Sequence, residues 1–154
     1  MFLAGHAAAG ALIGQQLQEN AILIFLLAFI SHFLLDLIPH GDHHHVVDYY
    51  FGKKEKLKEI YNTIKIDAVA TIIIVVVLLV YTHLNRIAIA WGIIGGVLPD
   101  LIVGLNELVK NSKIKWFTKF HFRVHNALVK SFDVKPWPGA VFQIIVIAAI
   151  LVAL

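Results

Sequence analysis

Long runs of apolar residues alternate with polar segments along the chain. Four runs approach the ~17–25 residues that an α-helix needs to cross ~30 Å of hydrocarbon. They are Ala21–Ile38, Ile64–Tyr81, Ile87–Leu105 and Pro138–Leu154. A fifth run, Phe2–Leu17, is shorter and rich in alanine and glycine, which favours a helix held by packing. The pattern predicts an all-α polytopic membrane helix bundle of about five membrane helices, folded as one domain over residues 1–154.

Glycines recur at helical spacing in two of these runs. Gly10 and Gly14 are four residues apart, as are Gly92 and Gly96. This spacing lets two helix backbones approach closely in lipid. No Lys or Arg precedes Lys53, so the charged start of a signal peptide is missing and the first run is expected to stay in the fold.

The polar segments differ in length and charge. His40–Lys65 contains a short basic helix, and Asn106–Lys135 is also rich in lysine. The other connections, Gln18–Asn20 and Thr82–Arg86, are minimal. Simple alternation of five helices places both long segments and the amino terminus on one side, together with every Lys and Arg except Arg86. Because cytoplasmic loops carry the positive excess, this side is expected to be cytoplasmic, with the carboxyl terminus outside.

The composition supports a membrane protein and narrows its chemistry. Hydrophobic residues make up 59% of the chain and charged residues 15%, against ~45–50% and ~25% in soluble domains. There is no cysteine, which excludes disulfides, thiolate metal sites and thiol nucleophiles. The basic segments flank apolar runs and carry no nucleic-acid motif, so nucleic acid is not an expected partner. Nine histidines remain to be explained.

Two pairs of polar residues have the i, i+4 spacing of metal-chelating helix faces. His32 and Asp36 lie in SHFLLD, and His121 and His125 lie in FHFRVHN on a predicted amphipathic interfacial helix. The alternative for the first pair is a hydrogen-bonded contact between helices, since a buried carboxylate needs a compensating partner. The alternative for the second pair is two surface histidines on a basic helix.

Three more ionisable residues interrupt apolar runs. Asp100 follows Pro99, which is expected to disturb its helix and free a backbone carbonyl. Asp67 lies near the start of the run Ile64–Tyr81, where the helix dipole alone would favour a carboxylate. His6 is either a ligand or a hydrogen-bonded core histidine.

The sequence HGDHHH follows the run Ala21–Ile38 and contains His40, Asp42 and His43–His45. His40 is close enough to the end of the run to reach a site there. A surface histidine run such as His43–His45 binds divalent ions loosely without forming a defined site.

Alternation of the helices brings the candidates to one face. His6, Asp36, Asp67 and Asp100 all fall near the cytoplasmic ends of their helices, within ~10 Å at 1.5 Å per residue. The opposite half of the bilayer holds almost no ionisable residue. The candidate ligands expected to converge are His6, His32, Asp36, Asp67, Asp100, His121 and His125.

Imidazole and carboxylate ligands without thiolate favour Zn²⁺, with Mn²⁺ or Mg²⁺ as alternatives. The candidates exceed the four ligands of one tetrahedral ion, so two or three ions are expected. Paired metals acidify a bound water and clamp both oxygens of a phosphoester displacement. An aspartate (Asp36 or Asp100) or His40 is the expected general base, and Arg123 is expected to hold a phosphate oxygen.

The motifs GH, SHFLLDLIPHGDH, GGVLPDLI and FHFRVHN together resemble the small membrane-bound metal-dependent hydrolases, which include LexA-regulated inner-membrane proteins of the YdjM type. In that type the LPD-like and paired-histidine elements come first, whereas SHFLLD comes first here. SHFLLDLIPH also resembles the H-x-x-x-D…P…H stretch of the zinc-dependent phospholipase C and P1 nuclease group. These resemblances imply an inner-membrane hydrolase acting on a phosphoester, including that of a lipid.

Two other functions fit part of the pattern. An ion or metal transporter needs polar groups at the midplane or along the full depth of the membrane, whereas these candidates cluster at one end. A structural subunit would use its metal only to tie helices together. A closed ligand shell would favour the structural role, and an open position facing a cleft would favour catalysis on an amphiphilic substrate.

Overall fold

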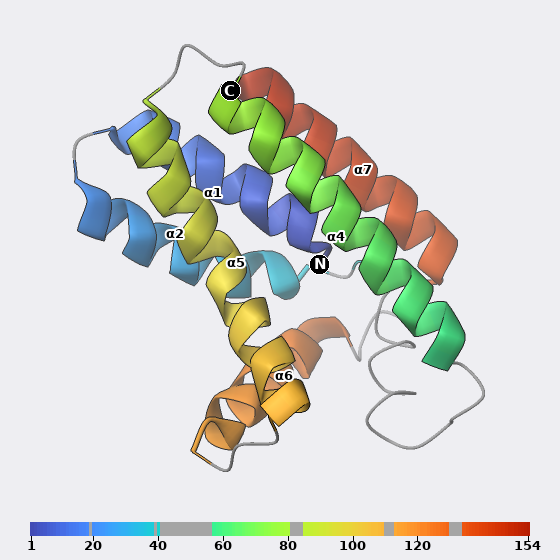
Figure 1. The fold of residues 1–154 in the computed structure, drawn as a ribbon. Helices are drawn as coiled ribbons and strands as arrows, with labels where there is room; N and C mark the ends of the chain where they lie inside the picture. The colour runs from blue at the N-terminus through green and yellow to red at the C-terminus, as the bar shows by residue number, and fades with distance from the viewer. Residues whose placement is uncertain (19, 39, 41–56, 81–84, 110–112, 130–133) are drawn as a thin grey trace.

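The computed structural model describes residues 1–154 except 19, 39, 41–56, 81–84, 110–112 and 130–133. The described chain is all-α, as predicted, and contains no strand (Figure 1). Its helices are α1 (Leu3–Leu17), α2 (Ala21–Asp36), α4 (Leu57–Val80), α5 (Arg86–Val109), α6 (Lys115–Val129) and α7 (Pro136–Ala153).

The number of membrane spans predicted from the sequence is not supported. By length and composition, one helix in the described residues is able to cross a membrane, over Arg86–Asn106 of α5. α1 has 15 residues and α2 has 16, which correspond to about 23–24 Å at 1.5 Å per residue, less than ~30 Å of hydrocarbon. The apolar part of α7, Trp137–Ala153, is also shorter than a full span. α4 has 24 residues but begins with the charged sequence LKEIYNTIKID.

The helix ends differ from the predicted boundaries for local reasons. The Asn20 side chain accepts a hydrogen bond from the backbone N–H of Leu23 at 3.0 Å and so caps α2. α2 ends at Asp36, three residues before Pro39, which lacks an N–H donor. The separate basic helix expected within His40–Lys65 is, from Leu57 onward, the start of α4. Pro99 lies inside α5 and does not end it.

α1 is the central helix, since it packs against α2, α4, α5 and α7 (Figure 1). Its closest neighbour is α5, and the glycines on both helices explain the approach. A Cβ atom on Gly92 would lie 1.9 Å from the carbonyl oxygen of Gly10, and one on Gly96 would lie 2.4 Å from that of His6. The close helix contact predicted from the glycine spacing is confirmed, and it brings His6 against the middle of α5.

A small apolar core forms where α1, α4 and α5 meet. Ala7, Ala11, Leu78, Ile89 and Ile93 are buried there. The outer faces of α2, α4 and α7 carry many exposed large apolar side chains, such as Ile22, Leu34, Ile72 and Val152. Exposed apolar surface on this scale is typical of contact with lipid or with another protein.

Candidate metal centre

The site is built around the carboxyl-terminal turns of α2. His32 and Asp36 are one helical turn apart and point in the same direction. Both side chains are buried, and His32 Nε2 lies 3.2 Å from Asp36 Oδ2. The i, i+4 spacing read from the sequence therefore brings these two groups together as predicted.

The ring of His32 is oriented by the backbone of α5. Its Nδ1 lies 2.8 Å from the carbonyl oxygen of Gly96. A carbonyl oxygen only accepts, so Nδ1 carries a proton and Nε2 faces the carboxylates. Histidines that bind metals are commonly oriented by such a bond from the other ring nitrogen.

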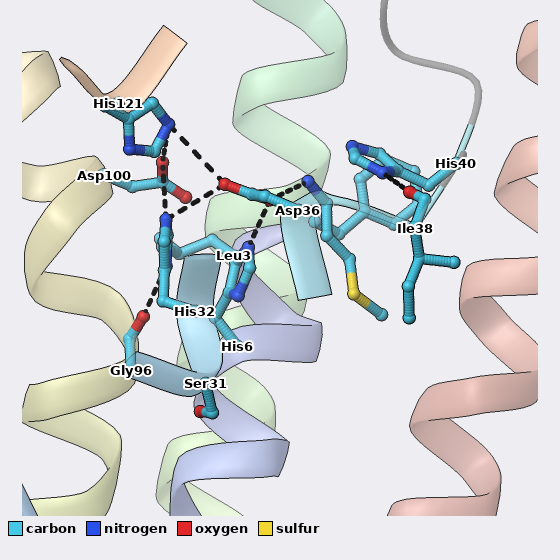
Figure 2. Close-up of polar contacts among 12 residues, drawn as sticks. Leu3, His6, Ser31, His32, Asp36, Ile38, His40, Gly96, Asp100 and His121 are labelled. Carbon is cyan, nitrogen blue, oxygen red and sulfur yellow. Dashed lines mark hydrogen bonds and ion pairs between the residues drawn. The ribbon is translucent and has the colours of Figure 1, made fainter. Parts of the chain in front are cut away.

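Asp100 from α5 and His121 from α6 complete a first group with His32 and Asp36 (Figure 2). His121 Nε2 lies 3.4 Å from Asp100 Oδ1 and 3.6 Å from Asp36 Oδ2. His32 Nε2 lies 3.7 Å from Asp100 Oδ1. One ligand atom from each of the four residues falls within 4.8 Å of the others, so this first group could hold a metal ion.

Asp36 also belongs to a second group, with His40 and His125. Their ligand atoms again lie within 4.8 Å of one another, and all three residues are buried. The rings of His40 and His125 are 5.0 Å apart between centroids. His40, expected as a general base, is thus placed among the candidate ligands, and His125 lies one turn beyond His121 as predicted.

The protonation of His121 suits metal binding. Burial lowers the pKa of the His121 imidazole from 6.5 to about 4, although the nearby carboxylates of Asp100 and Asp36 favour its charged form. The ring is therefore neutral at pH 7, which is the form that coordinates a metal.

Three observations test whether a cation fits these groups. His32 Nε2 is buried beside carboxylate oxygens, 3.2 Å from Asp36 Oδ2 and 3.7 Å from Asp100 Oδ1, but makes no well-directed hydrogen bond, although a buried ring nitrogen normally has one. A cavity of about 170 Å³ lies beside the groups, lined by Met1, Asp36, Asp100, Val103, His121, Phe122 and His125. The Asp100 side chain is 31% exposed, so the first group is accessible from outside. The donor types, the buried imidazole nitrogen and the cavity all fit a divalent ion.

His6 contacts the site without belonging to either group. Its Nε2 lies 3.1 Å from Asp36 Oδ1, and its ring stacks on that of His32 with centroids 3.8 Å apart (Figure 2). The Met1 amino group lies 2.6 Å from the same Asp36 oxygen. The structure thus places His6 as a hydrogen-bonding neighbour of Asp36, and its role as a direct ligand stays a prediction.

Asp67 is not brought into either group. Its carboxylate accepts hydrogen bonds from the backbone N–H groups of Leu3 at 2.7 Å and Ala4 at 3.2 Å. These N–H groups belong to the first turn of α1, where they have no partner within the helix. Asp67 therefore caps α1 from a neighbouring helix, and this contact accounts for a carboxylate at this part-buried position.

Replacing Asp67 with alanine is expected to destabilise the fold by about 0.5–2 kcal/mol, the usual cost of losing a helix cap. Metal content should equal that of the wild type, because the ligands of both groups remain. Thermal unfolding in detergent and elemental analysis of the same sample measure the two effects. Loss of metal from a folded Asp67→Ala protein would restore Asp67 as a ligand.

Arg123 does not face the site. It lies on α6 two residues from both His121 and His125, about 200° around the helix from each, and its side chain is exposed. Its predicted role in holding a phosphate oxygen at the metals is not supported by this placement. Asp42 and His43–His45 lie outside the described residues.

Gln143 was missed from the sequence because it is a single amide in the apolar run of α7. Its side chain is buried, donates to the carbonyl oxygen of His40 at 2.8 Å and accepts from the backbone N–H of Phe2 at 2.5 Å. It therefore joins α7 to the second group and to the start of α1. A polar residue inside an otherwise apolar helix was the available signal.

Comparison of the chain with models of protein families, with curated proteins and with solved structures gives no match.

Proposed function

We propose that this chain is a membrane-bound metal-dependent hydrolase with two divalent ions, most simply Zn²⁺, that cleaves a phosphoester of an amphiphilic substrate. The first ion is assigned to His32, Asp36, Asp100 and His121, and the second to Asp36, His40 and His125. Imidazole and carboxylate donors without thiolate suit Zn²⁺, and the carboxylates leave Mn²⁺ or Mg²⁺ as alternatives.

The observation that carries the proposal is that Asp36 is shared by the two groups. Its Oδ2 faces His32 and His121, so one carboxylate has several nitrogen ligands around it. A carboxylate in this position can bridge two ions, and paired ions are the common arrangement in phosphoester hydrolases. The second group offers three ligands, which would leave a tetrahedral ion one open position as in catalytic sites, and Asp36 and His125 of that group line the cavity.

When bound, two such ions would acidify a water molecule and neutralise charge that develops on a phosphoester. The residues have separate tasks. Asp100, at the exposed edge, can accept a proton from water. Gly96 fixes the ring of His32, and His6 Nε2–H donates to the Asp36 carboxylate. Gln143 holds the backbone of His40 in place.

Membrane association is part of the proposal. It is supported by the apolar span in α5 and by the exposed apolar faces of α2, α4 and α7. With the basic segments on the cytoplasmic side, the candidate metal centre would face the cytoplasmic leaflet of the inner or plasma membrane. An amphiphile could then reach the cavity from that leaflet.

The test combines elemental analysis of purified protein with assays of soluble phosphodiester and phospholipid hydrolysis, before and after chelation. We expect about two divalent ions per chain and hydrolysis that is lost on chelation and restored by the metal. His32→Ala should lose metal and activity together, because it removes a ligand and the bond to Gly96. Full metal content in His32→Ala would show that the ligand assignment is wrong. Metal-loaded protein that moves ions across vesicles and hydrolyses nothing would favour a transporter.

A further inference from the structure

α6 presents three chemically different rows of side chains, because residues four apart share one face of a helix. The buried row is Phe117, His121 and His125. An exposed row of cations is formed by Lys115, Lys119 and Arg123, called here the cationic row. Beside it, Trp116 is 66% exposed and Phe120 is 45% exposed. One face of α6 therefore builds the candidate metal centre while another carries cations and aromatics outward.

The orientation of these rows is fixed by packing. Phe117 lies against Phe29 and Phe33 of α2, with centroids 6.3 Å apart in each case. Phe120 contacts Phe33 at 5.4 Å. α6 lies at one end of the bundle, beside the carboxyl-terminal part of α5 (Figure 1). The cationic row cannot turn toward the interior without breaking these contacts and removing both histidines.

The charge and the apolar side chains of this surface point to the same ligand. α6 contains no Asp or Glu, so its cations have no acidic residue on their own helix. An amphipathic helix with basic residues beside exposed tryptophan and phenylalanine is typical of the membrane interface. Cations at that level attract anionic lipids by about 1 kcal/mol each, or about fivefold in affinity.

We propose that the cationic row of α6 binds the headgroups of anionic phospholipids on the face of α6 that points away from the metal centre, and that the anionic lipids gathered there supply the substrate, so that the lipid cleaved at the metals carries a net negative charge. The part of this inference that concerns the charge of the substrate rests on the proposed function, whereas headgroup binding does not. Arg123 then acts on the lipid surface and does not contact the metals.

The test measures lipid preference separately from catalysis. Protein in neutral detergent is titrated with short-chain phosphatidylglycerol or phosphatidylcholine, and Trp116 fluorescence is followed after Trp91→Phe and Trp137→Phe remove the other tryptophans. Protein with the wild-type α6 sequence should bind phosphatidylglycerol at least tenfold more tightly than phosphatidylcholine. Lys119→Gln/Arg123→Gln should reduce that preference about 25-fold, which abolishes a tenfold preference, since each cation contributes about fivefold.

The matched control is Arg86→Gln/Lys135→Gln, which removes two exposed cations that do not belong to α6. It should keep the phosphatidylglycerol preference. Equal binding of both lipids by the wild type, or a preference that survives loss of Lys119 and Arg123, would overturn the proposal. An equal response to inorganic phosphate alone would also overturn it, because the row would then bind a free anion.

Hydrolysis separates this inference from the proposed function. Phosphatidylglycerol should be cleaved at least tenfold faster than phosphatidylcholine, and the variant at Lys119 and Arg123 should lose that difference while keeping wild-type metal content. Lipid preference without any metal-dependent hydrolysis would support headgroup binding and contradict the proposed function. Hydrolysis with no dependence on headgroup charge would support the proposed function and overturn the substrate inference.

Discussion

Asp36→Asn is expected to weaken metal binding by more than about 100-fold and to reduce hydrolysis to background. Asp36 is the one residue common to both groups, and an amide cannot supply the negative charge that a buried divalent ion requires. Loss of a mere neighbour of a metal ligand costs ~10–100-fold, so loss of a shared ligand should exceed that range. Elemental analysis and metal titration of folded Asp36→Asn protein measure the effect.

The matched control is Asp67→Asn, the same chemical change at a part-buried carboxylate outside both groups. Asparagine is a good helix cap, so its side-chain oxygen can still accept from the first turn of α1. Metal content and activity should stay at wild-type levels. Similar losses in the two variants would mean that general disruption, and not the shared ligand, explains the result at Asp36.

The second large effect is expected at the contact between α1 and α5. In Gly92→Ala, the new Cβ would lie 1.9 Å from the carbonyl oxygen of Gly10, where only backbone movement can relieve the clash. Overpacking typically costs about 1–3 kcal/mol and sometimes more. Because the same contact holds His6 and Gly96 in place, metal binding should weaken together with stability. Thermal unfolding in detergent with and without metal measures both.

Gly104→Ala, on the same helix, is the control. No atom lies within 4 Å of the position that its Cβ would take. Alanine also favours a helix interior over glycine by roughly 0.5–1 kcal/mol. Gly104→Ala should therefore be as stable as the wild type or slightly more stable. If Gly92→Ala unfolds at the same temperature as Gly104→Ala, α1 and α5 do not approach closely at Gly10 and Gly92.

Local spacing explains why much of the site could be predicted from the sequence. His32 with Asp36, and His121 with His125, each lie one turn apart on a single helix, so their proximity needs no knowledge of the fold. Asp100 was expected to lie near both pairs because alternating helices would place all of these residues at one end of the bundle. The glycine spacing likewise indicated that the helices carrying it approach a neighbour closely, although it did not identify α1 and α5 as the pair.

Tertiary contacts explain what could not be predicted. Asp67 looked like a ligand because its sequence position gives no sign that the first turn of α1 packs against it. Gln143 acquires its role only when α7 lies beside Phe2 and His40. The number of spans was overestimated because hydropathy measures apolar runs, whereas the cap at Asn20 and the end of α2 at Asp36 set the helix length.

Anomalous X-ray diffraction at the absorption edge of the metal that co-purifies with the protein tests the central claim most directly. The account predicts one peak among His32, Asp36, Asp100 and His121, and a second among Asp36, His40 and His125. A metal bound elsewhere, with Asp36 contacting only His6, His32 and the Met1 amino group, would contradict it.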